Sequence, residues 1–253
     1  APSHCARELF TAISTHLNEG AILVSAAKGI EIETGKRISE IVKEVAGATN
    51  PFVCLSGPSF AKEVIAGHPT AIVAASKDAA AARTVQSELS FENLRIYTNA
   101  DVIGTEIGGS VKNVMAIAAG MATGLGFGSN SVAALITRGL AEITRLARRE
   151  GAQVETLMGL AGLGDLVLTC TGALSRNRFV GEELGKGKRL EEIIAELSEV
   201  AEGIKTARAV KQLADRANLE MPIVNEVNAV LYEGKSARDA VSELMSRPLR
   251  EEA

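Results

Sequence analysis

All strand-like segments of this chain lie in its first hundred residues, where they alternate with helical segments. Short apolar runs at 21–27, 52–55, 70–75 and 95–98 have the composition of buried strands, and segments with helical spacing of apolar residues separate most of them. This alternation is typical of a layer of mostly parallel strands covered by helices. We therefore expect the first part of the chain to fold as an α/β layer.

Helical periodicity takes over near residue 101, where the strand signals stop. Two long segments, 102–121 and 131–149, repeat apolar residues every three or four positions. Shorter helical segments follow at 190–197, 206–217, 223–231 and 237–245. The pattern predicts two domains, an α/β part at 1–103 and an all-helical part at 104–253.

Composition excludes several classes of partner. The 253 residues are 46% hydrophobic and 23% charged, with a net charge of -4, so nothing favours binding to nucleic acid. The apolar run at 21–27 is too short to span a membrane. Cys5, Cys54 and Cys170 are scattered, without metal-ligand or redox spacing, which predicts free thiols in a reducing cytoplasm and no metal site.

A dinucleotide-binding fingerprint is absent from these residues. An α/β layer followed by a helical domain suggests a nicotinamide-dependent dehydrogenase, which needs G-x-G-x-x-G between a strand and a helix. Gly124, Gly126 and Gly128 come close but follow a helical segment, and the glycines at 159–164 have the reverse spacing. Loops between helices explain both groups. The pattern alone leaves the cofactor undecided.

Lys112 is the most informative candidate for a catalytic residue. Helical spacing places it on one face with Gly108, Gly109, Ala116 and Ala119, which let another backbone approach closely. Desolvation there would lower the pKa of the lysine toward neutrality, as a general base for an alcohol proton requires. The alternative, which the pattern alone favours, is a lysine whose stem crosses apolar surface while its head reaches water.

Two further polar segments suggest substrate contacts. Ser175, Arg176 and Asn177 offer a hydroxyl, a guanidinium and an amide, which together suit the oxygens of a phosphate; the alternative is a solvated basic loop. Asp165 follows a glycine-rich turn and would bind substrate hydroxyls or position Lys112; the alternative is a helix cap.

Polar loops also follow two of the expected strands. Lys28 and Gly29 end the first run, and the segment 56–60 follows the next one. The carboxyl ends of strands form the edge where open α/β sheets bind ligands. Each loop alone is an ordinary strand exit, but together they predict two polar loops at one rim.

Taken in order, these residues closely resemble the bacterial NAD(P)-dependent glycerol-3-phosphate dehydrogenase family. The matching motifs span almost the whole chain: Pro2-Ser3-His4, Ala27-Lys28-Gly29, the segment 56–63, the segment 108–114, Ile136-Thr137-Arg138-Gly139-Leu140, the segment 162–166, Thr169-Cys170-Thr171, Ser175-Arg176-Asn177, Glu202-Gly203 and Met221-Pro222-Ile223.

The resemblance implies both a fold and a reaction. The fold would be α/β, an incomplete Rossmann-like parallel sheet followed by an all-α substrate domain. The reaction would interconvert sn-glycerol 3-phosphate and dihydroxyacetone phosphate with NAD(P)(H), to supply glycerophospholipid precursors in the cytoplasm. By analogy the protein would be a homodimer.

The resemblance also assigns roles to individual residues. Lys112 would be the catalytic base. The substrate-binding residues would be Lys28, Gly57, Ser59, Lys112, Asn113, Asp165, Thr169, Ser175, Arg176 and Asn177. The cofactor-binding residues would be Lys28, Ala61, Arg176, Val200 and Glu202.

The family places a strand, a G-x-G-x-x-G turn and a helix before the Pro2-Ser3-His4 motif. Because these are absent from the 253 residues, we expect a fragment with impaired cofactor binding and an exposed sheet edge. The preference for NAD or NADP stays open, since the residue that reads the ribose lies in the absent part.

Two alternatives to this activity are considered. A related dehydrogenase would act on another hydroxy acid, but a carboxylate substrate would not need the phosphate cradle at 175–177. A non-catalytic binding or dimerisation module would have lost its nucleotide half, but the retained Lys112, Asp165 and Arg176 argue against long drift.

Overall fold

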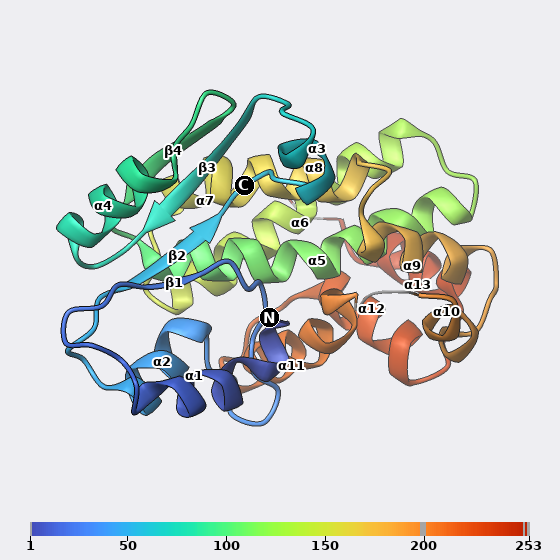
Figure 1. Cartoon of the computed structure of the whole chain (residues 1–253). Coiled ribbons are helices and arrows are strands. Elements are labelled where there is room, and N and C mark those ends of the chain that lie inside the picture. The colour runs from blue at the N-terminus through green and yellow to red at the C-terminus, as the bar shows by residue number, and fades with distance from the viewer. Residues whose placement is uncertain (1, 198–200, 250, 252–253) are drawn as a thin grey trace.

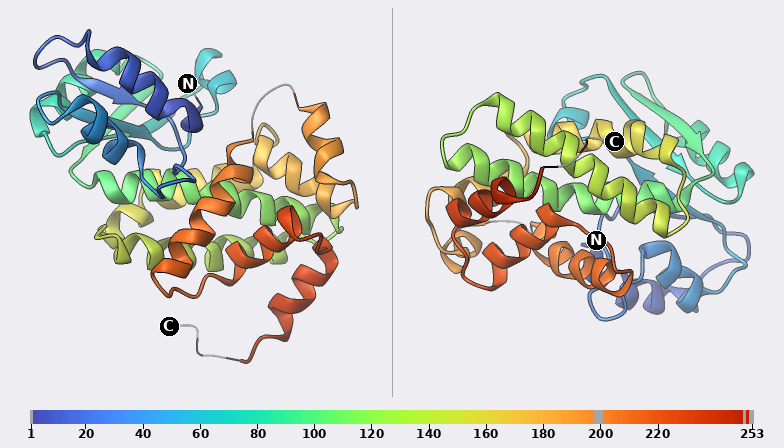
Figure 2. Two further views of the ribbon diagram at one scale, coloured as in Figure 1. Left: turned by 90° about the horizontal axis from the view of Figure 1, so that it is seen from below. Right: turned by 180° about the vertical axis from the view of Figure 1, so that it is seen from behind.

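The computed structural model describes residues 2–197, 201–249 and 251. A four-stranded sheet with its helices forms one part of the molecule and a group of helices forms the other (Figure 1). The long helix α5 (Val102–Gly124) runs between them. Two further views show the two parts lying side by side along this helix (Figure 2).

The α/β part follows the predicted alternation. A 3-10 turn at Ser3–Cys5 precedes the first helix. The elements are α1 (Ala6–Ser14), β1 (Leu23–Ser25), α2 (Ile38–Ala46), β2 (Phe52–Ser56), α3 (Ala61–Ile65), β3 (Thr70–Ala75), α4 (Ala79–Leu89) and β4 (Leu94–Asn99).

The sheet has the order β1-β2-β3-β4 and is mixed rather than wholly parallel. β1 pairs with β2 and β3 pairs with β4 in parallel, as expected, but β2 and β3 are antiparallel, with Cys54 opposite Ala75. The expectation of a parallel sheet is therefore wrong for this pair. The five-residue helix α3 stays at the end of the sheet where β2 ends (Figure 1), so the chain re-enters there and runs back, without the crossover that a parallel pair requires.

Both faces of the central strands are covered. Val53 of β2 packs in one cluster with Val85 of α4, whereas the next residue, Cys54, packs in another with Val102 of α5. Burial on both faces explains why these strands are continuous apolar runs rather than alternating ones. It also fixes the carboxyl end of β2 against α5.

The helical part is built around α5, which is buried over almost its whole length. A helix covered on all sides needs small residues where neighbours cross it, and Gly120 and Gly124 lie against the backbone of a later helix, α9. Around it lie α6 (Ser129–Arg149), α7 (Val154–Met158), a π-helical turn (Leu160–Gly164), α8 (Asp165–Thr171), α9 (Arg176–Gly185), α10 (Leu190–Glu196), α11 (Glu202–Arg216), α12 (Pro222–Tyr232) and α13 (Ala237–Ser246).

The connection between the two parts is short. β4 ends at Asn99, and Asp101 caps α5 by accepting a hydrogen bond from the backbone N–H of Gly104 at 2.9 Å. The domain boundary after residue 103 stays a prediction, because α5 packs against strands and helices alike. Among the described residues, no helix is long and apolar enough to cross a membrane and no group of side chains could hold a metal ion.

Candidate active site

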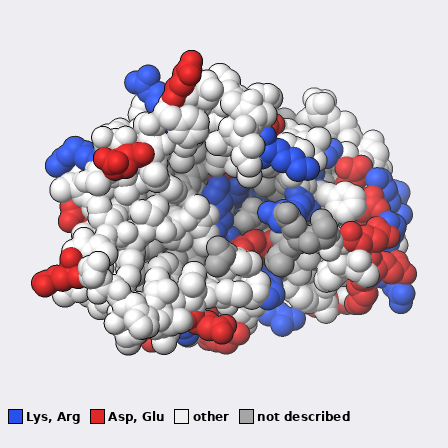
Figure 3. All heavy atoms as spheres, in the orientation of Figure 1, with Lys and Arg blue, Asp and Glu red and all other residues white. Residues whose placement is uncertain are grey.

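A pocket of about 250 Å³ lies between the two parts of the molecule. Its position is visible as a hollow in which basic side chains gather (Figure 3). Its lining residues come from the loop after β1, the start of α3, and helices α5, α8, α9 and α11: Ala26, Ala27, Lys28, Phe60, Lys112, Asn113, Thr169, Leu174, Ser175, Arg176, Asn177 and Glu202.

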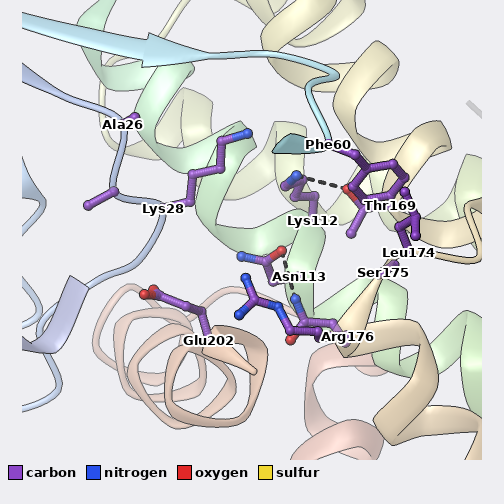
Figure 4. A pocket seen from close by; sticks show the side chains of 12 residues that line it. Ala26, Lys28, Phe60, Lys112, Asn113, Thr169, Leu174, Ser175, Arg176 and Glu202 are labelled. Atoms are coloured by element: carbon purple, nitrogen blue, oxygen red, sulfur yellow. Dashed lines mark hydrogen bonds between the residues drawn. The ribbon is translucent and has the colours of Figure 1, made fainter. Parts of the chain in front are cut away.

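Lys112 projects from α5 into this pocket and is only 5% exposed (Figure 4). Its amine donates hydrogen bonds to Oδ1 of Asp165 and, at 2.8 Å, to Oγ1 of Thr169. Burial, together with the positive charge of Lys28, lowers the pKa of Lys112 to about 7, although Asp165 acts in the opposite direction. The predicted desolvation of this lysine is confirmed, and the alternative of a solvated head group is wrong.

Asp165 joins two lysines from different parts of the chain. Its buried carboxylate accepts from Lys112 through Oδ1 and from Nζ of Lys28 through Oδ2, the latter at 2.7 Å. Lys28 also donates to the carbonyl oxygen of Gly57 at 3.1 Å. The side chain of Asp165 does not cap its helix, so the capping alternative is wrong.

Close backbone packing positions the carboxylate of Asp165 relative to Lys112. A Cβ on Gly108 of α5 would lie 2.7 Å from the carbonyl oxygen of Ala161, so only glycine lets the π-helical turn pack this closely. On the other side, Gly57 has a φ of +137°, and a Cβ there would lie 2.9 Å from Cα of Ile72. Gly108 thereby positions the turn that leads to Asp165, which contacts both lysines, and Gly57 positions the carbonyl oxygen that Lys28 contacts.

The segment at 175–177 is the start of a helix rather than a solvated loop. Ser175 is the N-cap of α9 and accepts a hydrogen bond from the backbone N–H of Arg178 at 3.2 Å. Arg176 and Asn177 are the first two residues of the helix. A helix N-terminus with an arginine beside it favours an anion, because its first backbone N–H groups lack helical partners.

Asn177 also connects three helices behind the pocket. It donates through Nδ2 to Oδ1 of Asn113 on α5 at 3.0 Å, and its own Oδ1 accepts from the backbone N–H of Gly203 on α11 at 2.9 Å. A Cβ on Gly203 would lie 2.7 Å from Oδ1 of Asn177 and 2.7 Å from the backbone carbonyl oxygen of Asn113, so glycine lets α11 approach this closely. One N–H of the Asn177 amide remains for a bound molecule.

Glu202 contacts the α/β part across the rim of the pocket. Its Oε1 accepts from the backbone N–H of Ser3 at 2.8 Å, and its Oε2 accepts from the Ser3 hydroxyl. A Cβ on Gly29 would lie 2.2 Å from the same hydroxyl oxygen, so glycine is required after Lys28. The carboxyl ends of β1 and β2 open toward this rim, as predicted from the two polar loops.

The structure brings most of the predicted site residues together. Those lining the pocket are Lys28, Lys112, Asn113, Thr169, Ser175, Arg176, Asn177 and Glu202. Asp165 and Gly57 join through hydrogen bonds to the two lysines, and the Ser59 hydroxyl donates to the Gly57 carbonyl at 3.1 Å. Ala61 begins α3 and lies outside the lining set, and Val200 lies outside the described residues.

Sequence reasoning missed four of the lining residues, which are Ala26, Ala27, Phe60 and Leu174. All four are small or apolar. No spacing distinguishes an apolar residue on a pocket wall from one in the core, although three of them adjoin polar residues that were predicted.

Two family models match the chain. The one described as NAD-dependent glycerol-3-phosphate dehydrogenase C-terminus matches residues 101–242, and the corresponding N-terminus model matches residues 1–82. The glycerol-3-phosphate dehydrogenase (NAD(P)+) of Koribacter versatilis (strain Ellin345) is 56% identical over 250 residues, which are 98% of this chain and 74% of the relative. The enzyme of the same name from Geobacter sulfurreducens is 52% identical over 254 residues, covering 100% of this chain and 76% of the relative.

A solved structure agrees with these sequence relatives. The 2.1 Å crystal structure of glycerol-3-phosphate dehydrogenase from Coxiella burnetii superimposes with a TM-score of 0.95 at 40% identity. The match covers 98% of this chain and 75% of that one. Fold, sequence and family models therefore agree, and the chain belongs to the NAD-dependent glycerol-3-phosphate dehydrogenase family of NAD(P)-dependent oxidoreductases.

Proposed function

We propose that Lys112 is the catalytic base for the interconversion of sn-glycerol 3-phosphate and dihydroxyacetone phosphate. The observation that carries this proposal is the buried amine of Lys112, held beside Asp165 and Thr169 in a pocket that also contains a helix N-terminus. Its pKa is lowered to about 7, chiefly by burial. At neutral pH a large fraction of such an amine is unprotonated and can accept a proton.

The hydrogen bonds of Lys112 orient its lone pair. A neutral amine has two N–H groups, and the two acceptors present are Oδ1 of Asp165 and Oγ1 of Thr169. The lone pair is then left for the hydroxyl at C2 of the substrate. Once the proton has arrived, Asp165 stabilises the resulting ammonium, and in the reverse direction Lys112 returns the proton to the ketone oxygen.

Lys28 places a positive charge beside the reacting oxygen. Two of its three N–H groups have acceptors, Asp165 and the Gly57 carbonyl, so the third is available to the substrate. Negative charge that develops on the oxygen during the reaction is stabilised by such a fixed donor. Gly57 and Ser59 complete this side of the substrate site.

The substrate phosphate is held at the start of α9 by Ser175, Arg176 and Asn177, with Asn113 behind them. The nicotinamide cofactor would supply the hydride chemistry at C2. In this proposal Lys28, Ala61, Arg176, Val200 and Glu202 bind the cofactor.

We further propose a role for the reaction in the cell. The product glycerol 3-phosphate would supply glycerophospholipid synthesis in the cytoplasm, with the protein acting as a homodimer. The widely spaced free cysteines Cys5, Cys54 and Cys170 support a reducing compartment.

Replacement of the base tests the proposal. In a preparation that binds the cofactor, Lys112→Ala is expected to lower kcat by about 10²–10⁴-fold, because the amine that accepts the proton is removed. Lys43→Ala, an exposed lysine of α2, is the control and should leave kcat unchanged. Normal turnover in Lys112→Ala, measured by NADH absorbance, would refute the assignment.

A further inference from the structure

Phe60 lines the pocket but belongs to neither the phosphate site nor the base. It follows β2 and the turn at Gly57, and it therefore comes from the α/β part of the molecule. Its ring reaches across to the connection between α8 and α9. A Cβ on Gly172 would lie 2.5 Å from Cε2 and 2.8 Å from Cζ of the ring, so the ring packs directly on the backbone there.

The ring forms an apolar wall on one side of the catalytic amine. Figure 4 shows Phe60 beside Thr169, on the opposite side of Lys112 from Lys28. Leu174 continues this wall toward the start of α9. The charged lining residues lie elsewhere around the pocket.

We propose that Phe60, with Leu174 beside it, limits the carbon chain of the substrate to three atoms. The inference rests on the proposed function, which fixes the phosphate at the start of α9 and the C2 hydroxyl at Lys112. With both points fixed, a substrate carbon added on the side of C2 away from the phosphate must find room inside the pocket.

The structure leaves little room for that carbon. Phe60 lines the pocket of about 250 Å³ on the side of Lys112 opposite Lys28. The Phe60 ring cannot retreat, because the backbone at Gly172 lies directly behind it. A longer polyol phosphate would have to displace the ring or leave the phosphate site.

The ring of Phe60 also contributes to the apolar surroundings of the catalytic amine. Burial is the main reason that the pKa of Lys112 lies near 7, and the ring of Phe60 is one of the side chains around the pocket that holds this amine. A smaller side chain at position 60 would admit water and let the pKa of Lys112 rise. Phe60 therefore affects both the size of the substrate and the proton affinity of the base.

Calorimetry with two phosphates tests the size limit. Dihydroxyacetone phosphate is compared with erythrulose 1-phosphate, which carries one more carbon on the side of the carbonyl away from the phosphate. In the unaltered protein the three-carbon ligand should bind more tightly. Phe60→Ala should reduce this preference by at least about tenfold, the smallest discrimination usual for one carbon in an apolar pocket, and Phe60→Leu should reduce it less.

Phe91→Ala is the matched control, because Phe91 is 55% exposed in the turn before β4. It should leave the preference unchanged. An unchanged preference for the three-carbon ligand in a folded Phe60→Ala variant would overturn the proposal. If that variant does not fold, the ratio of the two dissociation constants is measured in Phe60→Leu and decides instead. If the unaltered protein binds neither phosphate, it is the proposed function that fails.

A pH profile separates this role from a loss of packing. In a preparation that binds the cofactor, the lower limb of kcat/KM for oxidation of glycerol 3-phosphate should move to higher pH in Phe60→Ala, because the base becomes more hydrated. A uniform loss of rate with an unmoved limb would show that the ring only supports the fold.

Discussion

The proton affinity of Lys112 is set by opposing contacts at the scale of single residues. Burial and the charge of Lys28 lower its pKa, whereas the carboxylate of Asp165 raises it. The pKa of about 7 is the result of all three, which makes it sensitive to any one of them. Replacing Asp165 therefore tests how its carboxylate affects the pKa of Lys112.

Asp165→Asn is expected to move the lower limb of kcat/KM for alcohol oxidation to lower pH. The amide no longer favours the ammonium, so the pKa of Lys112 falls, while kcat drops because the ammonium formed in the reaction loses its counter-charge. Asp239→Asn, at the start of α13, is the control and should change neither quantity. An unmoved limb with normal kcat would show that Asp165 does not act on the base.

Individual elements were predicted best where they are long or strongly apolar. The strand predicted at 70–75 agrees with β3. The helices predicted at 102–121, 131–149 and 223–231 agree with α5, α6 and α12 within a few residues. The elements α3, α7, the π-helical turn, α8 and α9 were not predicted as such, because each is short and interrupted by glycine or polar residues. Apart from α3, these elements pack against α5, and their conformation depends on this packing more than on local pattern.

The long helix α6 carries a buried carboxylate that contacts the start of α12. Glu142 of α6 is 3% exposed and accepts hydrogen bonds from the backbone N–H groups of Ile223 at 2.8 Å and Val224 at 3.3 Å, in the first turn of α12. Burial raises its pKa to about 7, although the two N–H groups act in the opposite direction. The docking of α12 therefore depends on pH.

The free energy of unfolding is expected to fall as the pH rises through this range. The pKa of Glu142 is higher in the folded protein than in the unfolded chain, so protonated Glu142 stabilises the fold fully below the unfolded pKa. This stabilisation is lost as the pH rises through about 7. The change is on the order of 3 kcal/mol.

Glu142→Gln should remove this part of the pH dependence, because the amide stays neutral. Urea unfolding at pH 5 and pH 8 measures it, with Glu88→Gln, an exposed residue of α4, as the control. An equal pH dependence in both variants would contradict the assignment to Glu142.

At the scale of the whole molecule, the two parts are joined by buried polar contacts. Glu106 of α5 accepts from the backbone N–H of Ser39 at 2.7 Å, from its hydroxyl at 2.5 Å, and from Nη1 of Arg37 at 3.2 Å. Ile30, in the loop after Lys28, is buried in the helical core. These contacts hold the loop that carries Lys28 against the helix that carries Lys112.

Glu106→Ala is expected to destabilise the protein by about 1–3 kcal/mol, because Ser39 and Arg37 lose a buried acceptor while Arg37 keeps its ion pair with Glu40. It should also separate the unfolding of the two parts. The chain has two tyrosines and no tryptophan, with Tyr97 on β4 and Tyr232 on α12, so single replacements by phenylalanine let fluorescence follow each part. Coincident transitions in Glu106→Ala would show that other contacts suffice to join the parts.

The sequence by itself located the strands and most of the longer helices, and it identified the family and the candidate site residues. Periodicity located most strands and helices, and the motifs identified the family and the lysine that serves as the proposed base, because both kinds of signal are local in the chain. Only the tertiary structure decided the antiparallel pairing of β2 with β3, the sharing of Asp165 by Lys28 and Lys112, and the placement of Phe60 on Gly172. These depend on contacts between segments far apart in sequence, whose geometry and desolvation no local pattern specifies.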